Sequence, residues 1–314
     1  DTATTEIYTL SLHDAFRSSK EKKNTDVIKV SLLSASFGFL CVFMLMKLNF
    51  IQNWTIIKGG HTSLIQTLGF RHSNLAGILL FWISCLYSMY RKDKWKIFDW
   101  VIQIILIFLA TVIEKSSTAE IGIIMVIAYY LSSNKIESKK FIKKYKNIIF
   151  GILFGMISLL IYFTKYFNLN NPVHFFINNI MTNRLLQQFN YYESYGFSIL
   201  GNKEITYLVT TANYYQNDPF KHLIDWNLVS IDSGVAKLLI QYGIFYFFLF
   251  YGSILIGMKH FFDQKYFNIF SILAIVCITS FIDGQIIDPT TNFFAPILFS
   301  LIFVNNIKSE SVIQ

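Results

Sequence analysis

The chain alternates between long apolar runs and short polar patches. Windows of about 19 residues match the length that a helix needs to cross a hydrocarbon core about 30 Å thick. Such windows predict eight spans, at residues 30–46, 74–90, 97–113, 118–133, 147–164, 238–258, 266–282 and 291–304. One apolar run alone could equally be a buried helix of a soluble protein, but eight in series favour repeated membrane crossing. We therefore expect an all-α, polytopic transmembrane protein.

Composition agrees with a membrane protein. The chain has 314 residues, of which 54% are apolar and 15% charged, against about 45–50% and about 25% in an average soluble domain. This excludes an ordinary soluble enzyme. The net charge is +8, but the basic residues form small clusters between apolar runs, so nucleic acid is not an expected partner. Cys41, Cys85 and Cys277 each lie within an apolar run, which implies neither a disulfide nor a zinc site.

Residues 1–18, DTATTEIYTLSLHDAFRS, differ in character from the rest. The stretch lacks a starting Met and resembles the in-frame translation of a sequencing-library adapter, so we exclude it from fold reasoning. We expect residues 19–314 to form a single transmembrane domain. We also expect the chain to be an N-terminally truncated fragment of a larger protein with further spans.

The distribution of Lys and Arg predicts the orientation, because positive charges near span ends stay on the cytoplasmic side. One alternating set of connections, 19–29, 91–96, 134–146, 259–265 and 305–314, carries 17 basic residues in 47 positions. The other set, 47–73, 114–117, 165–237 and 283–290, carries nine in 112. We expect the first set to face the cytoplasm. The long loop 165–237 should then lie outside the cell membrane, folded as short helices over the spans because it is rich in Tyr, Phe and Ile.

Arginine is rare in this chain, and its placement indicates anion binding. The sequence has 23 Lys and four Arg, and two of the three arginines beyond residue 18, Arg71 and Arg184, fall in the predicted outer loops. A guanidinium group binds phosphate or carboxylate through two parallel hydrogen bonds, which Lys cannot do. We take Arg71 and Arg184 as candidate diphosphate ligands. The alternative is that they anchor the protein to lipid headgroups.

Asp232 and His72 are the candidate bases. Asp232 lies in LVSIDSGVAKLLIQYGI just before a predicted span, and a carboxylate at such a position can take a proton from a sugar hydroxyl. The alternative is that Asp232, or Ser233 beside it, caps the following helix. His72 in GFRHSN is a candidate base or phosphate ligand, although a lone histidine is more often structural.

Aromatic residues fill the segment between Arg184 and Asp232. They are Tyr191, Tyr192, Tyr195, Tyr207, Tyr214, Tyr215 and Trp226. Aromatic faces suit sugar rings, and we take Tyr192 and Tyr195 as candidate substrate-binding residues. Amphipathic aromatics also gather at membrane interfaces for purely physical reasons, and that alternative applies to each of them.

Several motifs of soluble transferases do not occur. The sequence has no Asp-x-Asp pair, no glycine-rich phosphate loop and no His or Cys metal spacing. We therefore expect no metal and no other cofactor. An enzyme acting outside the cell has no nucleotide supply, so the substrate must arrive activated, as a sugar on a lipid diphosphate does.

Three segments in this order carry a family resemblance: GFRHSN, NRLLQQFNYYESYGFSILGN and VSIDSGVAKLLIQYGI. Together with the predicted sidedness, they resemble the bacterial polysaccharide repeat-unit polymerases of Wzy type. These belong with the O-antigen ligases in the C-type glycosyltransferase class. The resemblance covers roughly residues 50–310, and its most specific part is the Arg-Leu start and Gly-rich end of the long loop, followed by Asp and a Tyr-Gly pair.

The resemblance implies a metal-independent glycosyltransferase of the bacterial cell membrane. Its donor would be an oligosaccharide on a polyprenyl diphosphate such as undecaprenyl diphosphate, and its acceptor a second lipid-linked repeat unit. The product would be a capsular, exopolysaccharide or O-antigen chain, with a flippase, chain-length regulators and membrane lipid as partners. By position, Arg184 would contact the donor diphosphate, Arg71 and His72 would line the same cavity, and Asp232 would stand where ligases carry a catalytic His.

One motif departs from the family, and two other functions remain open. Relatives often show a Ser-Arg pair entering the span after the short outer turn, whereas this chain has EKSSTAE at 114–120, with Lys115, Ser116 and Ser117 in its place. The alternatives are an O-antigen-ligase-like glycan transferase and a flippase or transporter for lipid-linked oligosaccharide. Transporters usually carry ionisable residues at mid-membrane, and the centres of these spans are almost free of charge.

Overall fold

The computed structural model describes most of the chain. The described residues are 24–53, 55–57, 64–66, 68, 70, 73–91, 95–113, 116–133, 136–181, 184–202, 231, 233–263 and 266–287. Residues 1–18 and the predicted span at 291–304 lie outside them.

Within these residues the chain is helical apart from one small hairpin. The elements are α2 (Asn24–Lys47), β1 (Thr55–Ile57), β2 (Leu64–Gln66), α3 (Ser73–Arg91), α4 (Ile97–Phe108), η1 (Leu109–Ile113), α5 (Ser117–Ser133), α6 (Ile136–Tyr166), α7 (Pro172–Ile180), α8 (Arg184–Tyr195), α9 (Gly234–Lys237), η2 (Leu238–Tyr242), α10 (Ile244–Asp263), α11 (Phe267–Ile282) and η3 (Gly284–Ile287). The first seven predicted segments are all helical. The antiparallel pair β1–β2 was not predicted.

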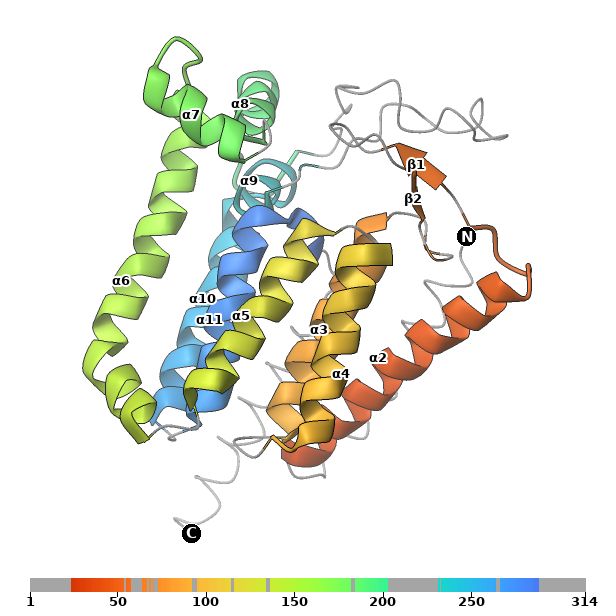
Figure 1. Ribbon diagram of the computed structural model, residues 1–314. Helices are drawn as coiled ribbons and strands as arrows, with labels where there is room; N and C mark the ends of the chain where they lie inside the picture. Colours follow the sequence, from red (N-terminus) through yellow and green to blue (C-terminus); the bar gives the residue numbers. More distant parts are fainter. Residues whose placement is uncertain are drawn as a thin grey trace.

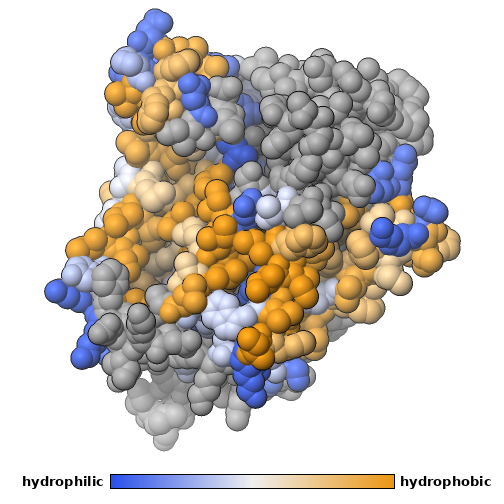
Figure 2. Space-filling view, viewed as in Figure 1, coloured by the Kyte–Doolittle hydropathy of each residue, from blue (hydrophilic) through white to orange (hydrophobic). Residues whose placement is uncertain are grey.

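Among the described residues, three helices are long and apolar enough to cross a membrane. They are Asp26–Lys47, Ile142–Tyr166 and Ile244–Asp263. Each exposes large apolar side chains: Phe37 on α2, Phe154 on α6 and Phe248 on α10 are 70%, 67% and 67% exposed. Figure 2 shows hydrophobic side chains over much of the middle of the visible face. The architecture is that of a helical membrane protein with three candidate spans.

The other four apolar helices are shorter. They are Leu75–Arg91, Ile97–Thr111, Thr118–Leu131 and Phe267–Ile282. The 16 residues of α11 rise about 24 Å, less than the thickness of an average hydrocarbon core. Eight spans therefore remain a prediction.

The core lies where α5 packs between α3 and α11. Gly122 on α5 makes this close approach possible, because a Cβ there would lie 2.6 Å from the ring of Phe81 on α3 and 3.2 Å from Thr279 on α11. Phe81, Trp82 and Phe281 are among the largest fully buried side chains. The small residue lets three apolar helices form one continuous core.

The helix ends form two groups. In Figure 1, α3 meets α4, α5 meets α6 and α10 meets α11 at the lower end, whereas α7, α8, α9 and the hairpin lie at the upper end. This grouping matches the two alternating sets of connections in the sequence. That the upper end faces the cell exterior remains a prediction.

Residues 196–202 are fastened at the upper end to the junction between η2 and α10. Ile244 N donates to Ser198 O at 2.9 Å and Phe245 N to Ile199 O at 3.1 Å, while the Asn202 amide donates to Ile240 O at 2.8 Å. The predicted span at 238–258 is thus two elements, the π-helical turn η2 and α10, separated at Gly243. This junction therefore holds residues 196–202 of the predicted long loop 165–237 against the bundle.

Candidate functional site

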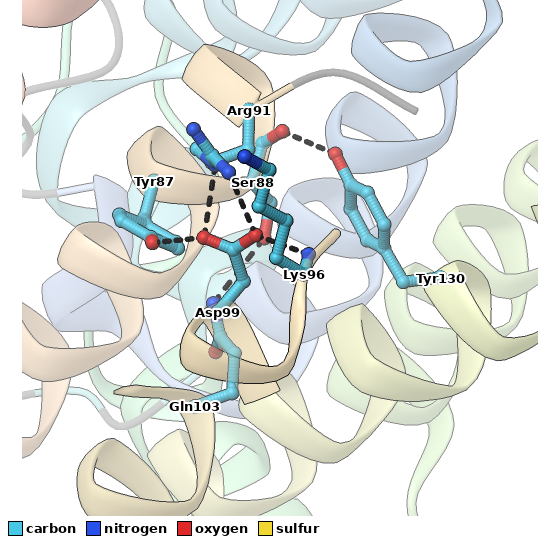
Figure 3. A network of polar contacts seen from close by, with 7 residues as sticks. All are labelled: Tyr87, Ser88, Arg91, Lys96, Asp99, Gln103 and Tyr130. Atoms are coloured by element: carbon cyan, nitrogen blue, oxygen red, sulfur yellow. Dashed lines mark hydrogen bonds and ion pairs between the residues drawn. The ribbon is translucent and has the colours of Figure 1, made fainter. Parts of the chain in front are cut away.

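The densest polar network described lies at the lower end, and Asp99 is its centre (Figure 3). Both carboxylate oxygens are used: Oδ1 accepts from the Tyr87 hydroxyl and pairs with Arg91 Nε at 2.9 Å. Oδ2 accepts from Arg91 Nη2 at 2.9 Å and from the backbone N–H of Lys96 at 2.5 Å. Asp99 is only 1% exposed. Because its acceptor positions are filled, we interpret this network as a structural clamp between α3 and α4.

A second layer of polar contacts continues the clamp toward α5. Ser84 Oγ donates to Gln103 Oε1 at 2.6 Å, and the Tyr130 hydroxyl donates to the Ser88 carbonyl. The Tyr130 ring stacks on Trp95 with 4.0 Å between centroids. The polar groups of Ser84, Ser88, Gln103 and Tyr130 are buried and form hydrogen bonds with one another. A low-dielectric interior requires such pairing of polar groups.

Replacing Asp99 tests the clamp. Asp99→Asn removes the ion pair with Arg91 and is expected to lower the free energy of unfolding by about 2–4 kcal/mol. This loss of unfolding free energy is somewhat smaller than the loss expected on breaking a fully buried ion pair, because the Arg91 side chain is 31% exposed and still reaches water. Chemical or thermal unfolding of the protein in micelles measures it. The matched control is Asp263→Asn, whose carboxylate is 54% exposed and lies 3.9 Å from Lys146, with an expected change within about 0.5 kcal/mol. Equal effects of the two changes would contradict the clamp.

At the upper end, Arg184 joins α8 to the end of α11. Its Nη1 donates to the carbonyl of Ile282, 98 residues away, and its side chain is half-buried. Carbonyls at a helix C-terminus carry partial negative charge and favour a cation. The guanidinium therefore has a structural partner, and this contact fixes its position on the bundle.

Gln188 and Tyr191 share a face of α8 with Arg184, because they follow it by four and seven residues. Gln188 is fully buried, and its Oε1 lies 3.2 Å from Thr164 Oγ1 on α6. Its Nε2 has no hydrogen-bond partner among the described residues. The buried residues of α8 are Leu185, Gln188 and Tyr191, so the face that α8 turns toward the bundle is apolar, then polar, then aromatic along the helix.

The two candidate tyrosines lie on this helix. Tyr195 stacks against Tyr191 at 6.4 Å between centroids, and Tyr192 contacts Phe197 at 4.6 Å. Both are half-buried and pack against a small cluster that includes Ile231, Ala236 and Ile240. Arg184, Tyr192 and Tyr195 lie on one short helix, with Arg184 as its first residue and Tyr195 as its last, and packing accounts for much of the surface of both rings.

Lys237 and Asp283 are charged residues of this region that sequence reasoning missed. They are 4% and 3% exposed. Lys237 is the last residue of α9, and Asp283 follows α11 directly. A Cβ at Gly284 would lie 3.1 Å from Lys237 Cδ and 2.6 Å from Ile231 O. Two basic side chains thus meet the same few residues, 282–284, one from α8 and one from α9. In the sequence, Lys237 could have been singled out because it stands directly before an apolar run.

Ser233 takes the N-cap position of α9, but its hydroxyl makes no capping hydrogen bond. Ser233 is fully buried, and its hydroxyl has no hydrogen-bond partner within the described part of the chain. Asp232, between the buried residues Ile231 and Ser233, lies outside the described residues, as do Arg71 and His72. In the segment EKSSTAE at 114–120, Ser116 is buried against Gly77 of α3.

Comparison with known proteins found nothing similar: no protein-family model, no curated protein and no solved structure matches the chain. The resemblance read from the sequence therefore stays a prediction. The chemistry that the resemblance implies depends on the arrangement of Arg184, Lys237 and Asp283 around the end of α11.

Proposed function

We propose that this protein is a membrane glycosyltransferase that joins lipid-diphosphate-linked oligosaccharide repeat units into a polysaccharide. The observation that carries the proposal is the convergence of Arg184 and the buried Lys237 on the end of α11. Among the described residues, two cationic side chains reach the residues around the buried Asp283. A diphosphate is a fitting ligand for such a pair, because guanidinium and ammonium groups both bind phosphate oxygens.

In the proposed reaction, a hydroxyl oxygen of the acceptor sugar attacks the anomeric carbon of the donor sugar. The bond between that carbon and the diphosphate oxygen breaks, and its electron pair leaves with polyprenyl diphosphate. The acceptor proton passes to Asp232, or to His72 as the second choice. Arg184 and Lys237 offset the charge that develops on the leaving diphosphate. Preorganised donors of this kind contribute about 3–4 kcal/mol each in other enzymes.

A ligase-like transferase is the second candidate, because it would use the same donor and the same leaving group. A flippase is less well supported. The buried charges Lys237 and Asp283 lie at the end of α11, whereas transporters usually bind their substrates near the bilayer midplane. The three functions differ in the acceptor and in whether a glycosidic bond forms.

One assay separates them. Lipid-linked repeat unit, extracted from cells in which this gene is deleted, is supplied alone to vesicles carrying the purified protein. A polymerase is expected to convert it into a ladder of chains that differ by one repeat unit, as seen on a gel. Product formed only after a different acceptor is added would indicate a ligase. Transfer across the bilayer without any new glycosidic bond would reject the enzyme.

A further inference from the structure

His174 fastens α7 to the top of α6. Its Nδ1 accepts a hydrogen bond from the backbone N–H of Asn168 at 3.0 Å, and the residue is 7% exposed. The imidazole stacks on Phe167 at 5.8 Å between centroids and meets Phe163 edge-on at 5.1 Å. The contact with Asn168 requires an imidazole nitrogen with a free electron pair, so the ring is neutral and its proton is on Nε2.

Four residues further along α7, Asn178 fastens this helix to α8. Its Oδ1 accepts from the backbone N–H of Leu186 at 3.0 Å, and Asn178 is 1% exposed. Phe167, which stacks on His174, also contacts Phe189 of α8 at 6.1 Å. Through α7, the contact of His174 therefore helps to hold α8, the helix that begins with Arg184.

We propose that His174 is a proton-sensitive latch that holds α7 and α8, and with them Arg184, in place when the imidazole is neutral. A protonated imidazole has two N–H donors and no acceptor. Turning the ring over does not restore an acceptor. Protonation thus leaves the Asn168 N–H without its partner and places a cation in a largely apolar enclosure, and both effects disfavour the latched arrangement.

Among the described residues, no carboxylate is in contact with the His174 ring. Tyr162 is the titratable group in ring contact, 6.2 Å from the imidazole, and Lys165 on the same helix holds its Nζ over the Tyr166 ring. The connection 167–171 and α7 carry no charged residue besides His174, and α8 contributes Arg184 and Glu193. Within the described residues His174 makes no ion pair. The face of Phe167 can support a cation in part, but it cannot replace the hydrogen-bond acceptor that protonation removes.

The direction of the pH effect follows from this geometry. The latched arrangement needs the neutral imidazole, because protonation removes the acceptor of the Asn168 N–H, so a lower pH disfavours it. A switch of one proton changes the ratio of released to latched molecules by at most about tenfold for each pH unit.

The test measures the distance between α6 and α8 directly. Spin labels are placed on exposed Ser158 of α6 and exposed Ser194 of α8, each changed to Cys in a Cys41→Ser background. We expect one narrow distance distribution at pH 8 and a second, longer distance at pH 5. His174→Asn keeps an acceptor near the position of Nδ1 but cannot titrate, so it should give the pH 8 distribution at both pH values. His260→Asn, on α10, is the matched control and should respond as the unmodified chain does.

The distances measured with His174 in place test the latch even if His174→Asn fails to fold. The same distribution at pH 5 and pH 8 with His174 in place would overturn the latch, as would an unchanged pH response in His174→Asn or a lost response in His260→Asn. The regulatory consequence rests on the proposed function: polymer synthesis should fall at pH 5 with His174 and persist with His174→Asn. A pH-dependent distance without any polymer synthesis would leave the latch standing and reject the transferase.

Discussion

Gly243→Ala is expected to prevent the protein from accumulating in folded form. Gly243 has φ of 95° and ψ of 163°, a combination that is almost confined to glycine and costs other residues about 1–3 kcal/mol. A Cβ at this position would lie 2.3 Å from Gly201 N and 2.5 Å from Ile199 O. Both contacts are with backbone, so no side chain can turn away to make room. The combined cost is a large share of a typical stability of about 5–15 kcal/mol.

The measurement is the yield of monodisperse protein after detergent extraction, together with its thermal unfolding. Gly252→Ala is the matched control: Gly252 lies on α10 itself, and a Cβ there meets no atom within 4 Å. We expect Gly252→Ala to keep the original yield and stability. If Gly243→Ala performed as well as this control, the close contact between residues 196–202 and the η2–α10 junction would be wrong.

Helix positions followed well from sequence wherever polar patches bound an apolar run on both sides. The predicted segments 74–90 and 266–282 differ by one residue at most from the ends of α3 and α11. The predicted span 147–164 lies within α6, but this helix begins well before the span, at Ile136. Its first turns are rich in Lys, a good helix former, and Lys146 packs over the Phe262 ring at 4.4 Å. Hydropathy detects the apolar part of a helix and misses an amphipathic extension.

The charged residues of the core and of the upper end could not be placed from sequence. Asp99 lies within the predicted span 97–113, and only its contacts with Tyr87 and Arg91 explain how a carboxylate is tolerated there. Lys237 and Arg184 are distant in sequence, and each reaches residues at the end of α11. Their meeting at the end of α11 depends on how distant helices pack. The spacing of apolar residues predicts single helices and does not predict which helices pack together. Arg184, chosen from its residue type and predicted side, contacts the end of α11, and its role as a diphosphate ligand stays a prediction.

Arg184→Lys is expected to reduce polymer synthesis roughly 100-fold at equal protein level, a loss typical of removing one preorganised donor to a developing charge. Lysine keeps the positive charge but loses the planar pair of donors that matches phosphate. It also loses the geometry in which Nη1 binds the Ile282 carbonyl while the rest of the guanidinium stays in place. The assay is the initial rate of ladder formation from lipid-linked repeat unit in vesicles.

Two comparisons separate a role in catalysis from a role in packing. Lys165→Gln removes an exposed cation near the end of α6, at the same upper end of the bundle, and is expected to leave the rate unchanged, because a solvated charge there contributes little to a buried site. Thermal unfolding of Arg184→Lys shows how much stability the lost contact with α11 costs. A variant that is as stable as the original chain but makes polymer at the full rate would remove Arg184 from the reaction. A variant that loses the same fraction of rate and of folded protein would limit Arg184 to joining α8 to α11.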